Sequence, residues 1–466
     1  MMNDTQKHIG ILGAGTWGLA LARVLYRNGH QVTVWSAIDR EIDSLSQTRV
    51  HPNLPGMEIP PEILFTKDPQ EVCRDKSILL FAVPSVYVRS TAARMRPFIP
   101  DGQIIVDVAK GIEPDTLLTM SEVIRDELQK DGSHQAVKLV ALSGPTHAEE
   151  VALDMPTSIV SACTDMDVAE AVQDVFMNSC MRTYTNTDVL GVELCGALKN
   201  IVALAAGISA GLGYGDNAKA ALITRGMAEI SRLGLMMGCA EQTFNGLAGI
   251  GDLIVTATSV HSRNNRCGQL IGQGMAPDEA VKAVGMVVEG VNALPAAVQL
   301  AERYQVEMPI VRAMSDVVQG RAAPSDIALA LMTRDKTSEV SQSEMAVRFE
   351  SALLRSRSGS VRRRVMVQGR FDRLDSEAIN LLRRARELGD HLTVALQGRD
   401  NTLPERRACL EALRHVDAVI AADTPEELLR AIRAQQVSVV AAVRPEAFAF
   451  LRDRGVEIVS LRESIA

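Results

Sequence analysis

The chain has 466 residues, a hydrophobic share of 47% and a formal net charge of −8. This length predicts two or three domains, the apolar content excludes a disordered chain, and the charge gives no support to a nucleic-acid partner. Seven scattered cysteines without C-x-x-C spacing predict neither a disulfide framework nor a metal site. The polar start and the lack of a long apolar span lead us to expect a cytoplasmic protein with no membrane span.

A glycine-rich turn near the start of the chain is the first distinctive motif. An apolar run leads into G-x-G-x-x-G, with Gly13, Gly15 and Gly18, and a helical pattern follows. In a dinucleotide-binding turn the first glycine permits the tight turn, the second lets the backbone approach a pyrophosphate, and the third lets the helix pack on the sheet. The pyrophosphate then lies at the positive end of the helix. A second apolar strand at residues 31–35 completes the expected context.

The end of the strand at residues 31–35 is where such sites distinguish NAD from NADP. No acid stands at its tip, where an NAD site places one to bond the ribose 2′-OH. Arg40 and Ser36 are suited to a 2′-phosphate, although Asp39 and Arg40 are equally well explained as solvated loop charges. These residues favour NADP slightly over NAD.

Near-continuous apolar runs predict further strands at residues 77–83, 103–108 and 138–142. Such runs are typical of a parallel sheet buried on both faces, so residues 1–190 are predicted to form an α/β Rossmann domain. Ligands of these sheets bind beyond the carboxyl ends of the strands. Pro84, Lys110 and Gly144 follow three strand ends, and we expect them to converge on the reactive half of the cofactor.

From about residue 191 the apolar residues recur at three- and four-residue spacing, which predicts an all-α second domain over residues 191–335. Lys199 and Asn200 lie inside its most apolar helix. Burying an unpaired ammonium is costly, so a partner or substrate is expected nearby. A lysine whose pKa is lowered by desolvation can give a proton to a carbonyl oxygen near neutral pH. A lysine that snorkels from the helix edge explains the sequence equally well.

Two polar segments follow in the helical domain. The glycine-rich residues 211–215 precede a helix, with Asp216 placed as its N-cap. Further along, Ser262, Arg263 and Asn264 offer the hydroxyl, guanidinium and amide donors that suit a phosphate. An arginine cluster by itself is more often a surface feature.

Residues 7–333 resemble the bacterial glycerol-3-phosphate dehydrogenases, the soluble NAD(P)-dependent family. The matching motifs are GAGTWG at 13–18, AVPS at 82–85, AKGIE at 109–113, SGPT at 143–146, GALKN at 196–200, GDNAKAALITRG at 215–226, GIGDL at 249–253, HSRN at 261–264 and VVEG at 287–290. The resemblance implies reversible reduction of dihydroxyacetone phosphate to sn-glycerol 3-phosphate, which feeds glycerophospholipid synthesis, with NAD or NADP as cofactor. It leaves a homodimer open.

The same resemblance implies roles for individual residues, with Lys199 as the catalytic proton donor and acceptor. The implied substrate contacts are Lys110, Gly144, Thr146, Lys199, Asp252, Ser262, Arg263 and Asn264. The implied dinucleotide contacts, beside Gly13, Gly15 and Gly18, are Thr16, Trp17, Lys110, Ala148, Arg263, Val287 and Glu289. The chain departs from the family at Ala37, where a His or Arg is usual, and at His147, where an aromatic residue is usual. The first change weakens the case for contacts to a 2′-phosphate, and the second removes no catalytic group.

A charged tract at residues 336–363 is predicted to be a solvated linker rather than an RNA-binding segment, because its arginines have no aromatic residues between them. A new α/β alternation follows at residues 364–466. Strands are predicted at 364–369, 391–396, 416–421, 437–443 and 456–461, and a helix at 377–388.

This last segment resembles the nucleotidyltransferases, most closely the heptose-phosphate adenylyltransferase type. The matching residues are Gly369-Arg370-Phe371-Asp372, Ala385 to Asp390 and Glu405 to Ala408, among others. That family holds a triphosphate with an H-x-G-H motif, where this chain has Asp375-Ser376-Glu377-Ala378. Two acids would repel a triphosphate, so we expect a domain that is inactive in catalysis and serves a regulatory or structural role.

Two other functions are compatible with the sequence. An NADP-dependent reductase of another small 2-hydroxy acid need not share the phosphate-binding set at residues 262–264. A redox-responsive scaffold, whose last domain binds a partner, would not need an intact Lys199 and Asp252. Activity with dihydroxyacetone phosphate, compared with phosphate-free substrates, discriminates among these functions.

Overall fold

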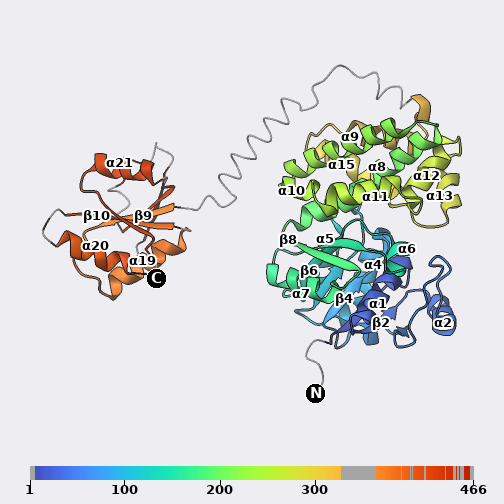
Figure 1. Ribbon diagram of the computed structural model, residues 1–466, viewed down its shortest axis with the longest axis horizontal. Helices are drawn as coiled ribbons and strands as arrows, with labels where there is room; N and C mark the ends of the chain where they lie inside the picture. Colours follow the sequence, from blue (N-terminus) through green and yellow to red (C-terminus); the bar gives the residue numbers. More distant parts are fainter. Residues whose placement is uncertain are drawn as a thin grey trace. The chain divides into compact units, whose positions relative to one another are not determined.

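The computed structural model describes residues 6–326 and 364–461, apart from residues 390, 399, 401, 414–415, 436, 444–447, 449–450 and 452–455. The chain divides into two compact units, residues 1–339 and 340–466 (Figure 1). The predicted linker at residues 336–363 lies outside the described residues.

The first unit begins with an eight-stranded sheet in the order β3-β2-β1-β4-β5-β6-β7-β8. Its strands are β1 (His8–Leu12), β2 (Gln31–Trp35), β3 (Leu64–Thr66), β4 (Ile78–Phe81), β5 (Ile104–Asp107), β6 (Lys138–Ser143), β7 (Thr157–Ala162) and β8 (Met181–Asn186). The first six are parallel, and β7 pairs antiparallel with β6. The sheet therefore has the expected Rossmann-type parallel half, extended by two strands of opposite direction.

Helices cover both faces of this sheet, as its continuous apolar strands require. On one face, α1 (Thr16–Arg27) and α7 (Met166–Phe176) pack against Ile9, Ile11 and Leu80. On the other face, α4 (Val88–Met95) and α5 (Met120–Leu128) pack against Leu79 and Phe81. Alternate residues of β1 and β4 thus enter opposite cores. The predicted strand at 31–35 coincides with β2, and the other three predicted strands differ from β4, β5 and β6 by one or two residues at an end.

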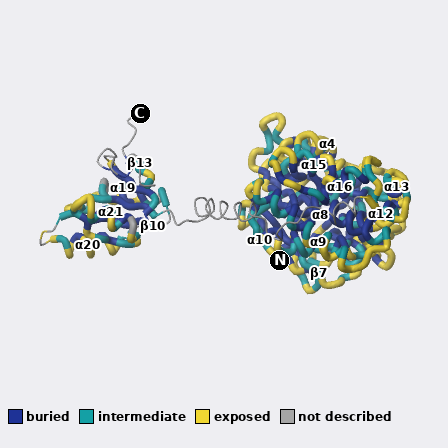
Figure 2. The backbone as a smooth tube through the Cα atoms, turned by 90° about the horizontal axis from the view of Figure 1, so that it is seen from above, coloured by how far each residue is buried: buried dark blue, intermediate teal, exposed yellow. Residues whose placement is uncertain are grey.

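The rest of the first unit is helical. Its helices are α8 (Val189–Gly211), α9 (Asp216–Met236), α10 (Glu241–Phe244), α11 (Asp252–Thr258), α12 (Arg263–Gly272), α13 (Pro277–Val284), α14 (Glu289–Asn292), α15 (Leu294–Arg303) and α16 (Pro309–Val318). α8 lies at the centre, and its residues 191–209 are buried all round (Figure 2). Within the described chain α8 is the one helix long and apolar enough to cross a membrane, but 89% of its most apolar stretch is buried inside the protein. Its apolar character is thus explained by its place in the core.

Small residues let α12 approach α8 closely. A Cβ on Gly207 of α8 would lie 2.1 Å from the carbonyl oxygen of Asn265, and a Cβ on Gly268 of α12 would lie 2.2 Å from that of Leu204. Neither position therefore accepts a side chain without movement of a backbone. This contact fixes the start of α12, where the predicted phosphate-binding residues lie, against the helix that carries Lys199.

The N-cap of α9 differs from the prediction. Gly215, in extended backbone, is the N-cap, and Asp216 is the first helical residue. The Asp216 carboxylate pairs with Lys219 at 3.2 Å rather than with a backbone N–H. The prediction of Asp216 as N-cap is wrong by one residue, although a negative charge in the first turn still suits the helix dipole.

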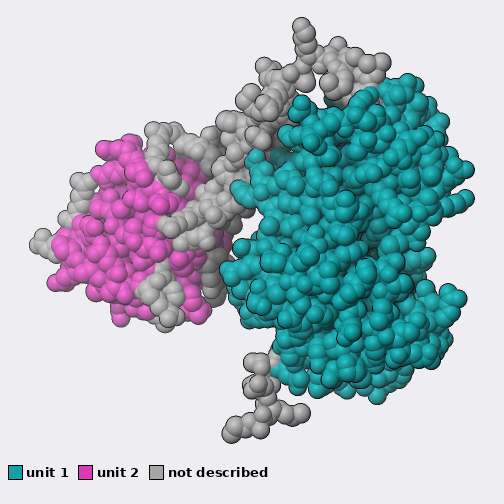
Figure 3. Space-filling model, turned by 45° about the vertical axis from the view of Figure 1, so that its right-hand side comes forward, with its two compact units in different colours: residues 1–339 teal, residues 340–466 magenta. Residues whose placement is uncertain are grey.

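The second unit, coloured magenta in Figure 3, contains a five-stranded sheet in the order β11-β10-β9-β12-β13. Its elements are β9 (Arg364–Gly369), α19 (Ser376–Glu387), β10 (His391–Leu396), α20 (Leu403–Glu411), β11 (Ala418–Ala421), α21 (Pro425–Ala434), β12 (Val439–Ala442) and β13 (Glu457–Ser460). All its strand pairs are parallel. β9 and β10 coincide with their predicted ranges, and the other three strands lie within theirs.

Candidate active site

The three glycines of the first turn have different surroundings. Gly13 has a φ of +120°, and a Cβ there would lie 2.4 Å from the carbonyl oxygen of Ala82. A Cβ on Gly18 would lie 2.3 Å from the carbonyl oxygen of Gly13, whereas a Cβ on Gly15 would meet nothing within 4 Å. The turn is therefore tight at Gly13, close-packed at Gly18 and open at Gly15.

The open position coincides with the start of a helix. Gly15 is the N-cap of α1, and no side chain caps the helix. Thr16 and Trp17, its first two residues, are half-buried. The uncapped N–H groups and the positive end of the helix dipole form an anion site, which the open backbone at Gly15 leaves accessible. These residues fit a dinucleotide pyrophosphate.

An acid that the sequence analysis did not single out lies at the end of β2. The hydroxyl of Ser36 donates to the carboxylate of Glu41, in the first turn of α2 (Asp39–Thr48), and accepts from the N–H of Ile38 at 3.2 Å. Arg40 is exposed. Because α2 brings Glu41 back to the end of β2, this strand end presents the carboxylate of Glu41 as well as the guanidinium of Arg40.

Lys199 lies buried in the middle of α8, with partners from α11. Its Nζ donates to Oδ1 of Asp252 and, at 2.6 Å, to Oγ1 of Thr256. Burial lowers the pKa of Lys199 to about 7, although the charge of Asp252 opposes this shift; the nearby charge of Lys110 lowers it further. The expectation of a nearby partner is confirmed, and a lysine that snorkels to the surface is excluded.

Lys110 approaches the same carboxylate from the sheet. Its Nζ lies 2.7 Å from Oδ2 of Asp252 and 3.3 Å from the carbonyl oxygen of Gly144, to which the hydroxyl of Thr146 also donates at 3.2 Å. Asp252 is fully buried. One carboxylate therefore joins two lysines, one from each half of the unit. The residues that follow β5 and β6 thus meet at this point, and their approach to the cofactor stays a prediction.

The three candidate phosphate residues at the start of α12 have different surroundings. Ser262 caps the helix by accepting from the N–H of Asn265 at 3.2 Å. Asn264 is buried; it donates to Oδ1 of Asn200 at 2.9 Å and accepts from the N–H of Gly290 at 2.9 Å. Arg263 is exposed, and no hydrogen bond or ion pair to another described residue occupies its guanidinium. Its donors are thus available to a ligand.

Glu289 connects the helical half to the carboxyl end of β4. Its carboxylate accepts from the N–H of Ser85 at 3.0 Å and from the Ser85 hydroxyl at 2.5 Å. Ser85 follows Pro84, the third predicted strand-end residue. Val287, two residues before Glu289, is half-buried, and Ala148, the first residue of α6 (Ala148–Ala152), is buried. The structure thus brings Glu289 to the carboxyl ends of the parallel strands, where the glycine turn also lies.

The sequence analysis assigned no site role to two residues near the lysines, Thr256 and His147. Thr256 lies one helical turn after Asp252, and this i, i+4 spacing on α11 would have indicated that their side chains share a face. His147 lies 3.4 Å from the carbonyl oxygen of Val255 through Nε2, and its ring centroid is 6.0 Å from that of His261. Burial, and the charges of Lys199 and Lys110, lower its pKa. No local pattern in the sequence indicated this contact.

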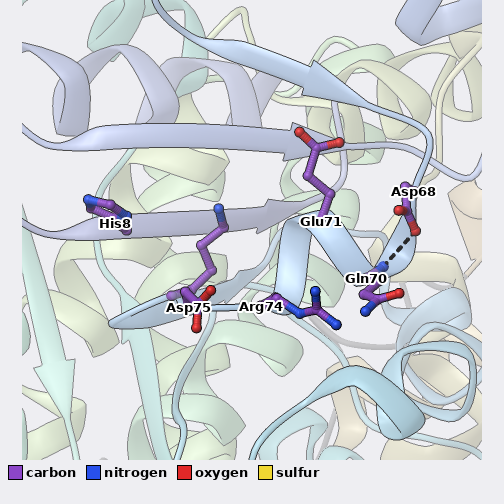
Figure 4. Close-up of a pocket in the computed structure, with 7 residues that line it drawn as sticks. His8, Asp68, Gln70, Glu71, Arg74 and Asp75 are labelled. Carbon is purple, nitrogen blue, oxygen red and sulfur yellow. Dashed lines mark hydrogen bonds between the residues drawn. The ribbon is translucent and has the colours of Figure 1, made fainter.

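An open pocket of about 430 Å³ lies away from these residues (Figure 4). It is lined by His8, Asp68, Gln70, Glu71, Arg74, Asp75 and Lys76. His8 begins β1, so the pocket is at the amino end of the strand, opposite the carboxyl end that leads into the glycine turn. The Asp68 carboxylate in it caps α3 (Pro69–Cys73) through the N–H of Gln70 at 2.9 Å. None of the candidate site residues lines this pocket.

A dinucleotide turn on a parallel sheet, opposite a buried lysine on a helical domain, defines a two-domain nicotinamide-dependent dehydrogenase. Two family models match the chain: the N-terminus of NAD-dependent glycerol-3-phosphate dehydrogenase over residues 8–169 and its C-terminus over residues 188–329. The chain belongs to this family. The models end before residue 340, so the second unit lies outside them.

Named relatives agree with the family models. The chain is 67% identical over 334 residues to glycerol-3-phosphate dehydrogenase [NAD(P)+] 2 of Lactobacillus delbrueckii subsp. bulgaricus, covering 72% of this chain and 99% of the relative. It is 48% identical over 337 residues to the Bacillus subtilis enzyme, covering 72% and 96%. The crystal structure of glycerol-3-phosphate dehydrogenase from Coxiella burnetii superposes with a TM-score of 0.67 at 35% identity, covering 71% of this chain and 99% of that chain.

Proposed function

We propose that this chain catalyses the reversible reduction of dihydroxyacetone phosphate to sn-glycerol 3-phosphate with NADH or NADPH. The observation that carries the proposal is the buried Lys199, whose pKa is lowered to about 7 and whose amine is held by Asp252 and Thr256. Relatives that share about half or more of their residues with the chain are named glycerol-3-phosphate dehydrogenases that use NAD(P)+.

Lys199 is the proposed proton donor. When bound, the nicotinamide supplies a hydride to the carbonyl carbon, so negative charge develops on the carbonyl oxygen. An ammonium has three N–H donors; two are used by Asp252 and Thr256, which leaves one for that oxygen. A pKa near the working pH suits a group that gives the proton in reduction and takes it back in oxidation.

The other residues hold the two ligands. The proposed substrate contacts are Lys110, Gly144, Thr146, Asp252, Ser262, Arg263 and Asn264. The proposed dinucleotide contacts are Gly13, Gly15, Thr16, Trp17, Gly18, Lys110, Ala148, Arg263, Val287 and Glu289. Arg263 supports the phosphate assignment because its planar guanidinium binds a phosphate with two parallel bonds, and no other described residue occupies it.

The cellular setting is part of the same proposal. The product, sn-glycerol 3-phosphate, would feed glycerophospholipid synthesis in the cytoplasm, and a homodimer stays a prediction.

The choice between NAD and NADP depends on the residues at the end of β2. Ser36 is bonded to Glu41, so of the residues that favoured NADP, Arg40 alone keeps its donors for a 2′-phosphate.

We further infer that residues 364–466 form a nucleotidyltransferase-like domain without catalytic activity. The carboxylate of Asp375 accepts from the N–H of Ala378 at 3.0 Å and caps α19, so a side chain of the domain itself takes the helix start that would hold a phosphate. Arg370 is paired with Asp372 at 3.2 Å and Asp400 at 3.4 Å. The side chain of Glu377, the second acid expected there, lies outside the described residues.

One assay tests the main proposal. Purified full-length protein is mixed with dihydroxyacetone phosphate and either NADH or NADPH, and the oxidation of NADH or NADPH is followed by absorbance. Phosphate-free 2-keto acids are the control, and a preference for them would favour the alternative function, a reductase of another 2-hydroxy acid.

A second assay tests the last domain. Pyrophosphate release from CTP or ATP with glycerol 3-phosphate is measured in the full chain and in a chain ended after Met345. We expect no release and similar dehydrogenase activity in both chains.

A further inference from the structure

The segment of residues 110–113, directly after β5, carries Lys110 and is held at three points. Lys110 itself bonds a carboxylate of α11 at 2.7 Å. Gly111 packs so closely on Ser85 that a Cβ at Gly111 would lie 2.4 Å from Cβ of Ser85. The third point is the carboxylate of Glu113, which is bound by an arginine of α4. The first contact belongs to the candidate site, whereas the third lies outside it.

Arg89 is that arginine, and it binds Glu113 through a fork of two bonds. Its Nε donates to Oε1 of Glu113 and its Nη2 donates to Oε2, both at 2.7 Å. The two side chains are half-buried, with 27% and 22% of their surface exposed. Parallel bonds of this kind fix the orientation of a carboxylate as well as its distance. The hydroxyl of Thr116 donates to the same carboxylate at 2.6 Å, and the bonds from Arg89 are the main cause that keeps the pKa of Glu113 below its ordinary value.

The same guanidinium is anchored on α5. Nη1 of Arg89 lies 2.5 Å from Oδ2 of Asp126 and 3.3 Å from Oε2 of the buried Glu127. With all three of its nitrogens engaged, the planar guanidinium is held in one orientation. Arg89 thus joins two helices, α4 and α5, to the segment after β5.

Ser85 and Arg89 contact this segment from the same side. The turn that begins at Ser85 runs directly into α4, so Ser85 and Arg89 are four residues apart along one helical path and lie on one face. Gly111 packs on Ser85, and Glu113 bonds Arg89. Two contacts in this register fix both the distance of the segment from α4 and its position along the helix. Lys110 lies one residue before the first of them.

The segment lies between the sheet half and the helical half of the first unit. Ile112 is buried in the same core as Leu194 of α8, and Lys110 bonds Asp252 of α11. These contacts tie the segment to the helical half, whereas the fork from Arg89 ties it to α4 on the sheet half. Loss of the fork would therefore leave the position of Lys110 to the helical half.

We propose that Arg89 is a positioning residue for Lys110: by holding Glu113 it fixes the segment after β5, and with it the Lys110 ammonium, at the place where the substrate binds. Among the described residues, Arg89 bonds none of the candidate substrate or dinucleotide contacts, so its effect passes through Glu113. A misplacement of about 1 Å is enough to slow a reaction by up to about 10²-fold. This inference rests on the proposed function, since Lys110 is a substrate contact named there.

Steady-state kinetics of Arg89→Ala in two backgrounds test this role. In the otherwise unchanged chain, we expect Arg89→Ala to lower kcat/KM for dihydroxyacetone phosphate about tenfold, mainly through KM. Lys110→Ala removes the group that Arg89 positions, so adding Arg89→Ala to Lys110→Ala should change kcat/KM by less than about twofold. Glu113→Gln keeps the shape of the side chain without its charge, and its kcat/KM should fall between those of the parent and Arg89→Ala.

Asp126→Asn and Arg96→Ala are the matched controls. Asp126→Asn changes another partner of Arg89 and leaves the fork to Glu113 in place. Arg96 pairs with Glu127 of α5 at 3.9 Å, and among the described residues it has no bond to Glu113. Both controls disturb ion pairs on α5 without touching the segment after β5, so we expect each to keep kcat/KM within about twofold of the parent.

The two backgrounds separate a positioning role from a general effect on the fold. An equal loss of kcat/KM from Arg89→Ala in both backgrounds, or no loss in the otherwise unchanged chain, would overturn the inference while parent activity upheld the proposed function. If Arg89→Ala does not fold, the same comparison is made with Glu113→Gln in both backgrounds. A parent without activity on dihydroxyacetone phosphate would overturn the proposed function and, with it, this inference.

Discussion

Asp252 and Lys199 form a buried hydrogen-bonded pair, and Lys110 bonds the second oxygen of the same carboxylate. Asp252 is therefore still paired when Lys199 is removed, which limits the penalty of an unpaired buried charge. We predict that Lys199→Ala lowers kcat by about 10² to 10⁴, the usual contribution of a general acid–base group, and leaves the dissociation constant for the dinucleotide nearly unchanged.

Turnover is measured by the change in absorbance as NADH or NADPH is oxidised. The dissociation constant is measured by fluorescence titration with NADH or NADPH. The control is Lys282→Ala, because Lys282 is an exposed lysine of α13 in the same helical half. Near-normal turnover in Lys199→Ala would show that another group gives the proton.

The lowered pKa of Lys199 predicts opposite pH profiles for the two directions of the reaction. Burial, the main cause, lowers this pKa to about 7. The ammonium is present below that pH and is lost above it, so kcat/KM for reduction should fall as the pH rises through about 7. Oxidation of glycerol 3-phosphate needs the neutral amine, so its kcat/KM should rise over the same range. Profiles that fall in both directions would indicate titration of the substrate or loss of the fold instead.

The guanidinium of Arg263 has no other described partner, which makes its contribution to phosphate binding measurable. We predict that Arg263→Ala weakens binding of dihydroxyacetone phosphate by about 1.5–3 kcal/mol, the scale of a hydrogen bond to a charged group. Substrate titration of parent and variant gives this value from KM. Arg266→Ala is the control, since Arg266 is an exposed arginine on the same helix. An unchanged KM in Arg263→Ala would place the phosphate elsewhere.

The strands β1, β2, β4, β5 and β6 were predictable because their side chains enter cores on both faces, which leaves an uninterrupted apolar run such as β4. The strands β3, β7 and β8 were not predicted: β3 has only three residues, and β8 alternates buried with exposed positions. The lysine centre was predictable in part. Lys199 was notable as a charge in an apolar helix, but its bond to Asp252 joins residues 53 positions apart, and Lys110 lies 142 positions from Asp252. Only the packing of α8 and α11 against the sheet brings these groups together.

The contact between Ser36 and Glu41 predicts how cofactor preference responds to charge. A carboxylate at the end of β2 suits a ribose 2′-OH and repels a 2′-phosphate. We predict that Glu41→Gln raises the ratio of kcat/KM with NADPH to kcat/KM with NADH by about two- to fivefold, the size of one exposed charge interaction. Arg40→Ala should lower the same ratio. Identical ratios in all three proteins would mean that neither side chain faces the ribose.

The two glycines at the start of α1 provide a pair of substitutions that separates binding from folding. At Gly15 an added methyl group meets no protein atom within 4 Å, whereas at Gly18 it would lie 2.3 Å from the carbonyl oxygen of Gly13. We predict that Gly15→Ala keeps the melting temperature of the parent but binds the reduced nicotinamide about tenfold more weakly, because the methyl group occupies the path of the pyrophosphate. Gly18→Ala should lower the melting temperature, since α1 must move away from the sheet.

Thermal unfolding and the fluorescence of bound NADH or NADPH, measured on both variants, separate the effect on folding from the effect on binding. Normal binding by Gly15→Ala would show that the pyrophosphate does not approach the chain at this turn.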